Sequence, residues 1–246
     1  MQNYKMVLQY EGTRYNGWQR QGNTDNTLQA IVEKALFDIT GEQVEINGSG
    51  RTDAGVHAMG QCANFKLQEP VSCEKIKGEL NKSLNKDICV LSVEKADGRF
   101  HARLNAKGKT YVYRVAIGEK ADVFKRRVMF HYPCTVDVEA LKKAAELLTG
   151  KHDFKAFCSN HRTKKSTVRT IYSIDISLEN QVLEMRFTGN GFLYNMVRIL
   201  SGTLLDVAVG KIKPEDMTTI VGSLDRQKAG PTLPSGGLTL ERVYYN

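Results

Sequence analysis

The sequence predicts an α+β protein built from two tandem halves, each with the element order β-α-β-β-α-β. Segments whose apolar residues share one helical face alternate with segments in which every second residue is apolar. The same order of elements occurs on both sides of residue 105, so we expect one half at 1–105 and the other at 106–246. Two tandem ferredoxin-like units have this order.

In the first half, helix caps and period-two segments mark the elements. Asn26 or Thr27 can cap a first helix that ends before Gly41, and Ser72 can cap a second. The expected strands are residues 5–10, 44–46, 62–67 and 88–93.

The second half repeats this pattern without a clear sequence repeat. Asn180-Gln181 is expected to form a turn between two alternating segments. The expected strands are residues 110–117, 173–178, 183–187 and 238–244, the last closing the sheet of this half. The expected helices are 138–148, 192–207 and a short one with Pro214 in its first turn.

Composition narrows the class of protein. The 246 residues are 41% apolar and 25% charged, which is typical of globular proteins. No apolar run has the length of a membrane span and no signal sequence is recognisable, so we expect a cytoplasmic protein without membrane contact. Five cysteines without a C-x-x-C pair argue against a disulfide framework and a thiolate zinc site.

A net charge of +8 favours an acidic partner, and nucleic acid is the commonest one. Aromatic residues lie among the basic ones, as expected for a surface that stacks bases and neutralises phosphates. The alternative of a merely solvated basic face stays open, above all for the third group. The groups are Arg99, Arg103, Lys107, Lys109 and Arg114; Lys125, Arg126 and Arg127; and His161, Arg162, Lys164, Lys165 and Arg169, with Tyr111, Tyr113 and Phe124 among the first two.

A glycine-rich tract at residues 47–58 is the first candidate site. It lacks the G-K-[ST] of a P-loop and precedes a strand, which excludes a dinucleotide fingerprint. It contains one carboxylate, Asp53, close to Arg51 and His57. Asp53 is either a functional carboxylate or an ordinary turn residue. His57 is more often structural, and we assign it no chemical role.

A second tract at residues 189–198 leads into an apolar helix with Leu193 and Val197 on its apolar stripe. Arg198 lies among these apolar residues and requires an anionic partner if it is buried. Asp53 and Asp206 are equal candidates for that partner.

Several short motifs occur in order along essentially the whole chain. They are residues 10–13 (Y-E-G-T), 17–21 (G-W-Q-R-Q), 50–58 (G-R-T-D-A-G-V-H-A), 100–103 (F-H-A-R), 109–114 (K-T-Y-V-Y-R), 192–198 (F-L-Y-N-M-V-R), and 229–231 with 237–238. On these motifs the chain resembles the tRNA pseudouridine synthase A family over essentially its whole length. Ala208 stands where that family often has glycine, which bears on local helix packing only.

The resemblance implies a pseudouridine-synthase fold, with a mixed, mainly antiparallel sheet and a central RNA-binding cleft. It implies a homodimer that modifies uridines 38, 39 or 40 of tRNA, without metal or cofactor. The family's catalytic aspartate, its partner arginine and its nucleotide-handling arginine fall on Asp53, Arg198 and Arg51. Tyr111 falls on the aromatic that packs on uracil. The further substrate contacts are expected at Arg103, Lys109, Leu193 and Val197.

The chemistry agrees with this interpretation. Moving the glycosidic bond from N1 to C5 changes no oxidation state, and one carboxylate suffices if it attacks C1′ or takes the 2′ proton. A non-catalytic RNA-binding protein is the alternative, but it gives no reason for Asp53 among glycines. A glycosidase or nucleoside hydrolase would also use a carboxylate at C1′, but it normally needs a second carboxylate, which neither tract supplies.

Overall fold

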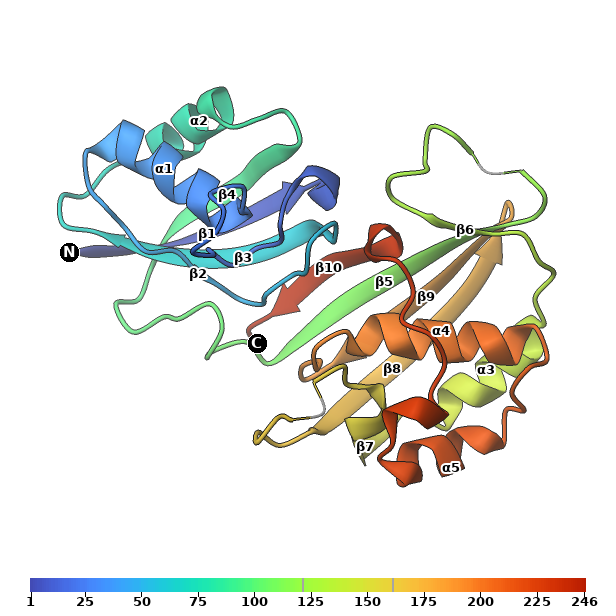
Figure 1. The fold of residues 1–246 in the computed structure, drawn as a ribbon. Coiled ribbons are helices and arrows are strands. Elements are labelled where there is room, and N and C mark those ends of the chain that lie inside the picture. Colours follow the sequence, from blue (N-terminus) through green and yellow to red (C-terminus); the bar gives the residue numbers. More distant parts are fainter. Residues whose placement is uncertain (121, 161) are drawn as a thin grey trace. The chain divides into compact units, whose positions relative to one another are not determined.

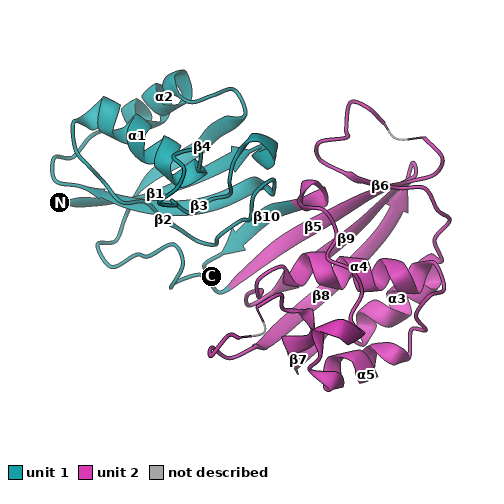
Figure 2. Ribbon diagram, in the orientation of Figure 1, with its two compact units in different colours: residues 1–107, 239–246 teal, residues 108–238 magenta. Residues whose placement is uncertain are grey.

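The computed structural model describes residues 1–120, 122–160 and 162–246, so His161 of the third basic group lies outside the described residues. The described residues form two compact units (Figure 2): unit 1 contains residues 1–107 and 239–246, and unit 2 contains 108–238. Each unit combines a sheet with helices, which confirms the α+β class. Within the described ranges, no helix combines the length and the apolar character that a membrane span needs.

Unit 1 has a four-stranded antiparallel arrangement in the order β4-β1-β3-β2, the strand order of a ferredoxin-like unit. Two helices cover one face of this sheet (Figure 1). A further strand, β10, pairs in parallel with β3, with Thr239 opposite His57. The elements are β1 (Gln2–Tyr10), α1 (Leu28–Thr40), β2 (Asn47–Gly48), β3 (His57–Leu67), α2 (Cys73–Ser83), β4 (Ile88–Ala96) and β10 (Leu238–Tyr244).

The predicted helix caps of unit 1 are confirmed. The Thr27 hydroxyl accepts a hydrogen bond from the Ala30 N–H at 3.3 Å, and Gly41 ends α1 in the left-handed region, at φ 74°. The strand expected at residues 44–46 is wrong, since β2 begins at residue 47. The reason is local: the Ile46 N–H donates to the Glu33 carboxylate instead of to a neighbouring strand.

Unit 2 has an antiparallel sheet in the order β5-β9-β8-β7, and β6 pairs in parallel with β5. The predicted turn between β8 and β9 is confirmed, because Asn180 and Gln181 both have positive φ, as a two-residue hairpin requires. The elements are β5 (Gly108–Ile117), β6 (Phe130–Tyr132), α3 (Val138–Glu146), β7 (Gly150–Asp153), β8 (Val168–Glu179), β9 (Val182–Gly189), α4 (Met196–Ala208) and α5 (Asp216–Ser223). Short 3-10 turns occur at Gly12–Arg14, Lys155–Phe157, Arg226–Lys228 and Ser235–Gly237.

Two features of the expected second half differ from the expectation. The helix expected from residue 192 begins at Met196, because Asn195 adopts a left-handed conformation at φ 61° that a continuous helix excludes. The last strand, β10, was expected to belong to a second half at 106–246. Residues 239–246 instead group with unit 1.

The only tryptophan of the chain is packed against a glycine of β2. Trp18 is 2% exposed and stacks on Tyr10 at 6.2 Å between ring centroids. A Cβ atom on Gly48 would lie 2.3 Å from the indole Nε1. Glycine at this position is therefore required by the volume of the indole.

We expect Gly48→Ala to destabilise the protein by about 1–3 kcal/mol, because the added methyl group overpacks the indole site. A shift of tryptophan fluorescence and a lower thermal midpoint would report this change. Gly78→Ala is the matched control: its added Cβ meets nothing within 4 Å and lies inside α2, so stability should rise by up to about 1 kcal/mol. Equal effects of both variants would contradict the packing argument.

Candidate active site

Asp53 lies on the loop between β2 and β3, and backbone hydrogen bonds fix the shape of this loop. The Trp18 N–H donates to the Thr52 carbonyl at 2.9 Å, and the Val56 N–H donates to the Asp53 carbonyl at 3.1 Å. Gly55 completes the turn with φ 79°, a conformation that favours glycine. The loop therefore holds the half-buried Asp53 side chain on a rigid backbone.

A second segment, residues 12–18, packs directly on the Asp53 loop. A Cβ atom on Gly12 would lie 2.0 Å from the Val56 carbonyl oxygen, and one on Gly17 would lie 2.7 Å from the Thr52 carbonyl oxygen. Gly17 also has φ 90°. These glycines are needed because the two backbones touch, and this contact joins the motifs at 10–13 and 17–21 to the motif at 50–58.

Buried polar side chains support the loop from the sheet side. The Tyr10 hydroxyl and the Thr52 hydroxyl are 2.8 Å apart, and Gln61 donates to the Gly50 carbonyl at 2.8 Å. The Ser49 hydroxyl donates to the Gln61 side-chain oxygen at 2.7 Å. Burial raises the pKa of Tyr10 well above its ordinary value, so its hydroxyl stays neutral and available for hydrogen bonding.

The contacts of His57 are structural, as expected from the sequence. It is 3% exposed, and its Nδ1 accepts a hydrogen bond from the Gly12 N–H at 3.0 Å. The Glu11 carboxylate lies 3.7 Å from the same nitrogen. His57 thereby ties the segment that begins at Gly12 to the start of β3.

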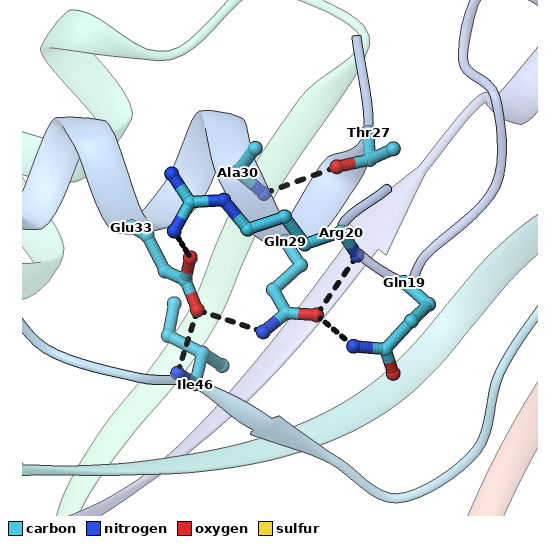
Figure 3. A network of polar contacts seen from close by, with 7 residues as sticks. All are labelled: Gln19, Arg20, Thr27, Gln29, Ala30, Glu33 and Ile46. Atoms are coloured by element: carbon cyan, nitrogen blue, oxygen red, sulfur yellow. Dashed lines mark hydrogen bonds and ion pairs between the residues drawn. The ribbon is translucent and has the colours of Figure 1, made fainter. Parts of the chain in front are cut away.

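Arg51 is exposed and is held at one nitrogen. Its Nε donates to the Gln19 side-chain oxygen at 3.0 Å. Gln19 in turn donates to Gln29 at 2.8 Å, and Gln29 donates to the Glu33 carboxylate at 2.8 Å (Figure 3). Arg51 is thus the outer end of a network that begins inside α1.

In unit 2, β5 presents two tyrosines with different surroundings. Tyr111 is 8% exposed, and the Phe192 ring meets it edge-on at 5.3 Å between centroids, which fixes the plane of the ring. Tyr113 is fully buried and its hydroxyl donates to the Pro234 carbonyl at 2.7 Å. Burial raises the pKa of Tyr113 above its ordinary value. The interpretation of Tyr113 as part of a base-stacking surface is therefore wrong.

Arg198 lies in the first turn of α4, where neighbouring oxygens fix its side chain. Its Nε donates to the Leu233 carbonyl at 2.7 Å, and one terminal nitrogen donates to the Asn195 side-chain oxygen at 2.8 Å. Asp206, one of its two candidate partners, pairs with Lys211 at 3.2 Å, two helical turns away. The pairing of Arg198 with Asp53 stays a prediction.

Leu193 and Val197, the two apolar candidates in the tract at residues 189–198, do not lie on the same helix. Val197 is 3% exposed on α4, whereas Leu193 is half-buried and precedes the helix. The expected single helical stripe through both residues is therefore wrong. The left-handed Asn195 separates them.

The basic candidates differ in how exposed their side chains are and in whether a carboxylate pairs with them. Arg103 is exposed beside Ala102, whose N–H is held by the buried Asn64 side chain at 2.8 Å. Lys109 is half-buried on β5, opposite Gly189. Arg114 pairs with Glu184 at 2.6 Å, which neutralises it and removes it from the group of candidate phosphate ligands. The residues of the other two groups that stay exposed are Lys125, Arg126, Arg127, Arg162, Lys164 and Lys165.

Unit 1 thus brings Asp53 and Arg51 together on one loop, and unit 2 carries Tyr111, Lys109, Leu193, Val197 and Arg198. Sequence reasoning missed Gln19, Gln29 and Glu33. Gln29 and Glu33 are four residues apart on α1 and are 4% and 7% exposed, which places two polar residues on a buried face. In the described parts of the chain, no three His, Cys, Asp or Glu side chains gather as metal ligands do.

Comparison with known proteins places the chain in a family. A chain in the crystal structure of a Cbf5-Nop10-Gar1 complex is similar at a TM-score of 0.40 and 12% identity over 97% of this chain and 48% of that one, a likeness too weak to carry an argument. The tRNA pseudouridine synthase A of Bacillus sp. (strain KSM-64) is 44% identical and that of Caldicellulosiruptor bescii 43% identical, each over 100% of both chains. The profile of the tRNA pseudouridine synthase family matches residues 6–105 and 144–246, and the chain belongs to this family.

Proposed function

We propose that this protein isomerises uridine to pseudouridine in the anticodon stem-loop of tRNA, at positions 38, 39 or 40, with Asp53 as the catalytic carboxylate. Membership of the tRNA pseudouridine synthase family supports the reaction. The observation that carries the role of Asp53 is its loop, where two glycine contacts and two backbone hydrogen bonds hold a half-buried carboxylate.

The reaction breaks the bond between N1 and C1′, turns the uracil and forms the bond between C5 and C1′. C5 loses its proton and N1 gains one, so atoms and electrons balance without an oxidant. Asp53 acts in one of two ways: its carboxylate attacks C1′, or it removes the 2′ proton. A rigid loop suits both routes, because the carboxylate keeps its position while the base turns.

The remaining candidates receive roles that follow from their chemistry. Arg198 pairs with Asp53 and lowers its carboxyl pKa, as an adjacent cation does. Tyr111 provides the flat wall on which the loosened uracil rests. Arg51 contacts the flipped nucleotide. In this proposal both expected halves contribute, 1–105 with the Asp53 loop and 106–246 with Tyr111 and Arg198.

The apolar and basic candidates complete the proposed substrate site. Leu193 and Val197 contact the substrate, while Arg103 and Lys109 grip phosphates and offset the cost of flipping a base out of its stem, a few kcal/mol. We further propose a cytoplasmic homodimer that binds one tRNA with residues of both subunits.

Asp53→Asn is expected to fold and to bind tRNA within a small factor of the wild-type affinity, yet to form no pseudouridine. Asparagine keeps the size of the side chain but is neither a useful nucleophile nor a base. Single-turnover release of tritium from C5-labelled uridine measures the reaction. Asp38→Asn, which removes the same charge from an exposed ion pair with Lys34, is the control and should retain turnover. Residual activity of Asp53→Asn within about tenfold of wild type, or about 1.4 kcal/mol in barrier, would move the chemistry to another residue.

Tyr111→Ala is expected to lose about 1–3 kcal/mol of transition-state stabilisation, the range for one base–aromatic stack. Tyr111→Phe keeps the ring and its edge contact with Phe192, so it should lose less. Turnover of both variants is compared at a temperature at which both are folded, as judged by circular dichroism. An alanine variant as fast as wild type would remove the stacking role.

Affinity for tRNA is expected to fall by about a thousandfold or more between 50 and 200 mM salt if six or more phosphates are bound. The exposed basic residues of the three groups are the proposed ligands. Filter binding across a salt series gives the slope of log affinity against log salt. A flat line would show that phosphate contacts do not dominate binding.

A further inference from the structure

A directional chain of side-chain hydrogen bonds leads from the interior of α1 to Gln19 (Figure 3), and Gln19 in turn bonds to Arg51 on the Asp53 loop. Glu33, which is 7% exposed, accepts from Gln29 at 2.8 Å and from the Ile46 N–H at 2.9 Å through one oxygen. Its second oxygen lies 3.4 Å from Arg20. A carboxylate only accepts hydrogen bonds, so Gln29 must turn its NH₂ group toward Glu33.

The orientation of Gln29 determines the orientation of Gln19, the next amide toward the surface. With its NH₂ group on Glu33, Gln29 presents its oxygen to the Arg20 N–H at 3.0 Å and to the Gln19 NH₂ group at 2.8 Å. Gln19 must then present its own oxygen outward, and this oxygen accepts from Arg51 Nε at 3.0 Å. The buried carboxylate therefore determines that an acceptor, and not a donor, faces the arginine.

We propose that Gln29 and Glu33 are positioning residues for the isomerisation, acting through Gln19 to fix the guanidinium of Arg51 on the loop that carries Asp53. The inference rests on the proposed function of Arg51. Among the described residues, the two terminal nitrogens of Arg51 bond to none. The fixed Nε thus leaves the two-pronged end of the guanidinium for a phosphate oxygen pair of the nucleotide.

Burial alone does not explain the outer end of this network. Ile46 and Arg20 are enough to satisfy both oxygens of Glu33. The Ile46 backbone N–H donates a hydrogen bond to one oxygen, and the Arg20 guanidinium forms an ion pair with the other. Gln19 is half-exposed and Arg51 is exposed, so water could satisfy both. An exposed arginine loses rotamer entropy when it is held. Holding it in advance removes that loss from the step that positions the flipped nucleotide for reaction, which is the advantage of preorganisation.

The orientation is measured directly by the Arg51 Nε–H resonance in a ¹H–¹⁵N NMR spectrum of the full chain, assigned by its loss in Arg51→Lys. Gln19→Met and Gln29→Met keep side-chain length but remove the amides. Both are expected to shift this resonance and speed its exchange with water. Gln19→Glu keeps an acceptor for Nε but has no NH₂ group for the Gln29 oxygen, so its Nε signal should stay protected through the direct contact with Arg51 alone. Gln19 is half-exposed, so its variants fold even if the buried Gln29 site tolerates no change.

Activity supplies the second readout. Both methionine variants should lower the single-turnover rate of pseudouridine formation about tenfold, the effect of one hydrogen bond to a charged group, with little change in tRNA affinity. Ser72→Ala is the control, because it removes the helix cap of α2 in the same unit without touching the network. It should lower the thermal midpoint but leave the rate and the Arg51 resonance unchanged.

The outcomes separate this inference from the proposed function. An Arg51 resonance unchanged in Gln19→Met and Gln29→Met overturns the positioning role, whatever happens to the rate. A resonance that shifts without any loss of rate overturns it as well, because Arg51 orientation would then not matter for the reaction. Wild-type protein that forms no pseudouridine would refute the proposed function, while the NMR result would still report whether the network orients Arg51.

Discussion

The contact of one backbone segment with another, residues 12–18 against the Asp53 loop, is the constraint on which the candidate site depends. Side chains at Gly12 and Gly17 would occupy the space of the Val56 and Thr52 carbonyl oxygens. Direct backbone contact lets the Trp18 N–H bond to the loop and places Gln19 next to Arg51. The loop is therefore held by a segment that is distant in sequence as well as by its own turn at Gly55.

The features that follow from local physical chemistry could be predicted from the sequence. Thr27 and Gly41 delimit α1 because capping and left-handed backbone are properties of single residues. The same holds for the Asn180-Gln181 turn. The start of α4 was missed, since the apolar spacing continues from Leu193 into the helix and gives no sign of the left-handed Asn195. Strands β6 and β7, of three and four residues, are too short for a periodic signal.

In the candidate site too, residues marked by their local sequence could be predicted, whereas residues whose burial depends on distant segments could not. Asp53 could be found from its glycine-rich surroundings and from the family motif around it. Tyr113 was placed with the exposed aromatics because sequence alternation does not tell which face of β5 is covered, and its burial against Pro234 depends on a segment 121 residues away. Gln29 and Glu33 were missed for a related reason: polar residues on a helix are normally taken to face water, and only the fold encloses them.

Enclosing Glu33 has a cost that explains the form of the network. A buried carboxylate is unfavourable unless its oxygens are bonded, and the fold supplies an amide, a backbone N–H and a guanidinium for them. Once Glu33 is satisfied in this way, the orientations of Gln29 and Gln19 follow without further cost. Gln29 takes part in both sets of contacts, since it bonds to Glu33 inside α1 and to Gln19 next to Arg51. We therefore expect a substitution that displaces Gln29 to affect the Arg51 side of the loop as well as the helix.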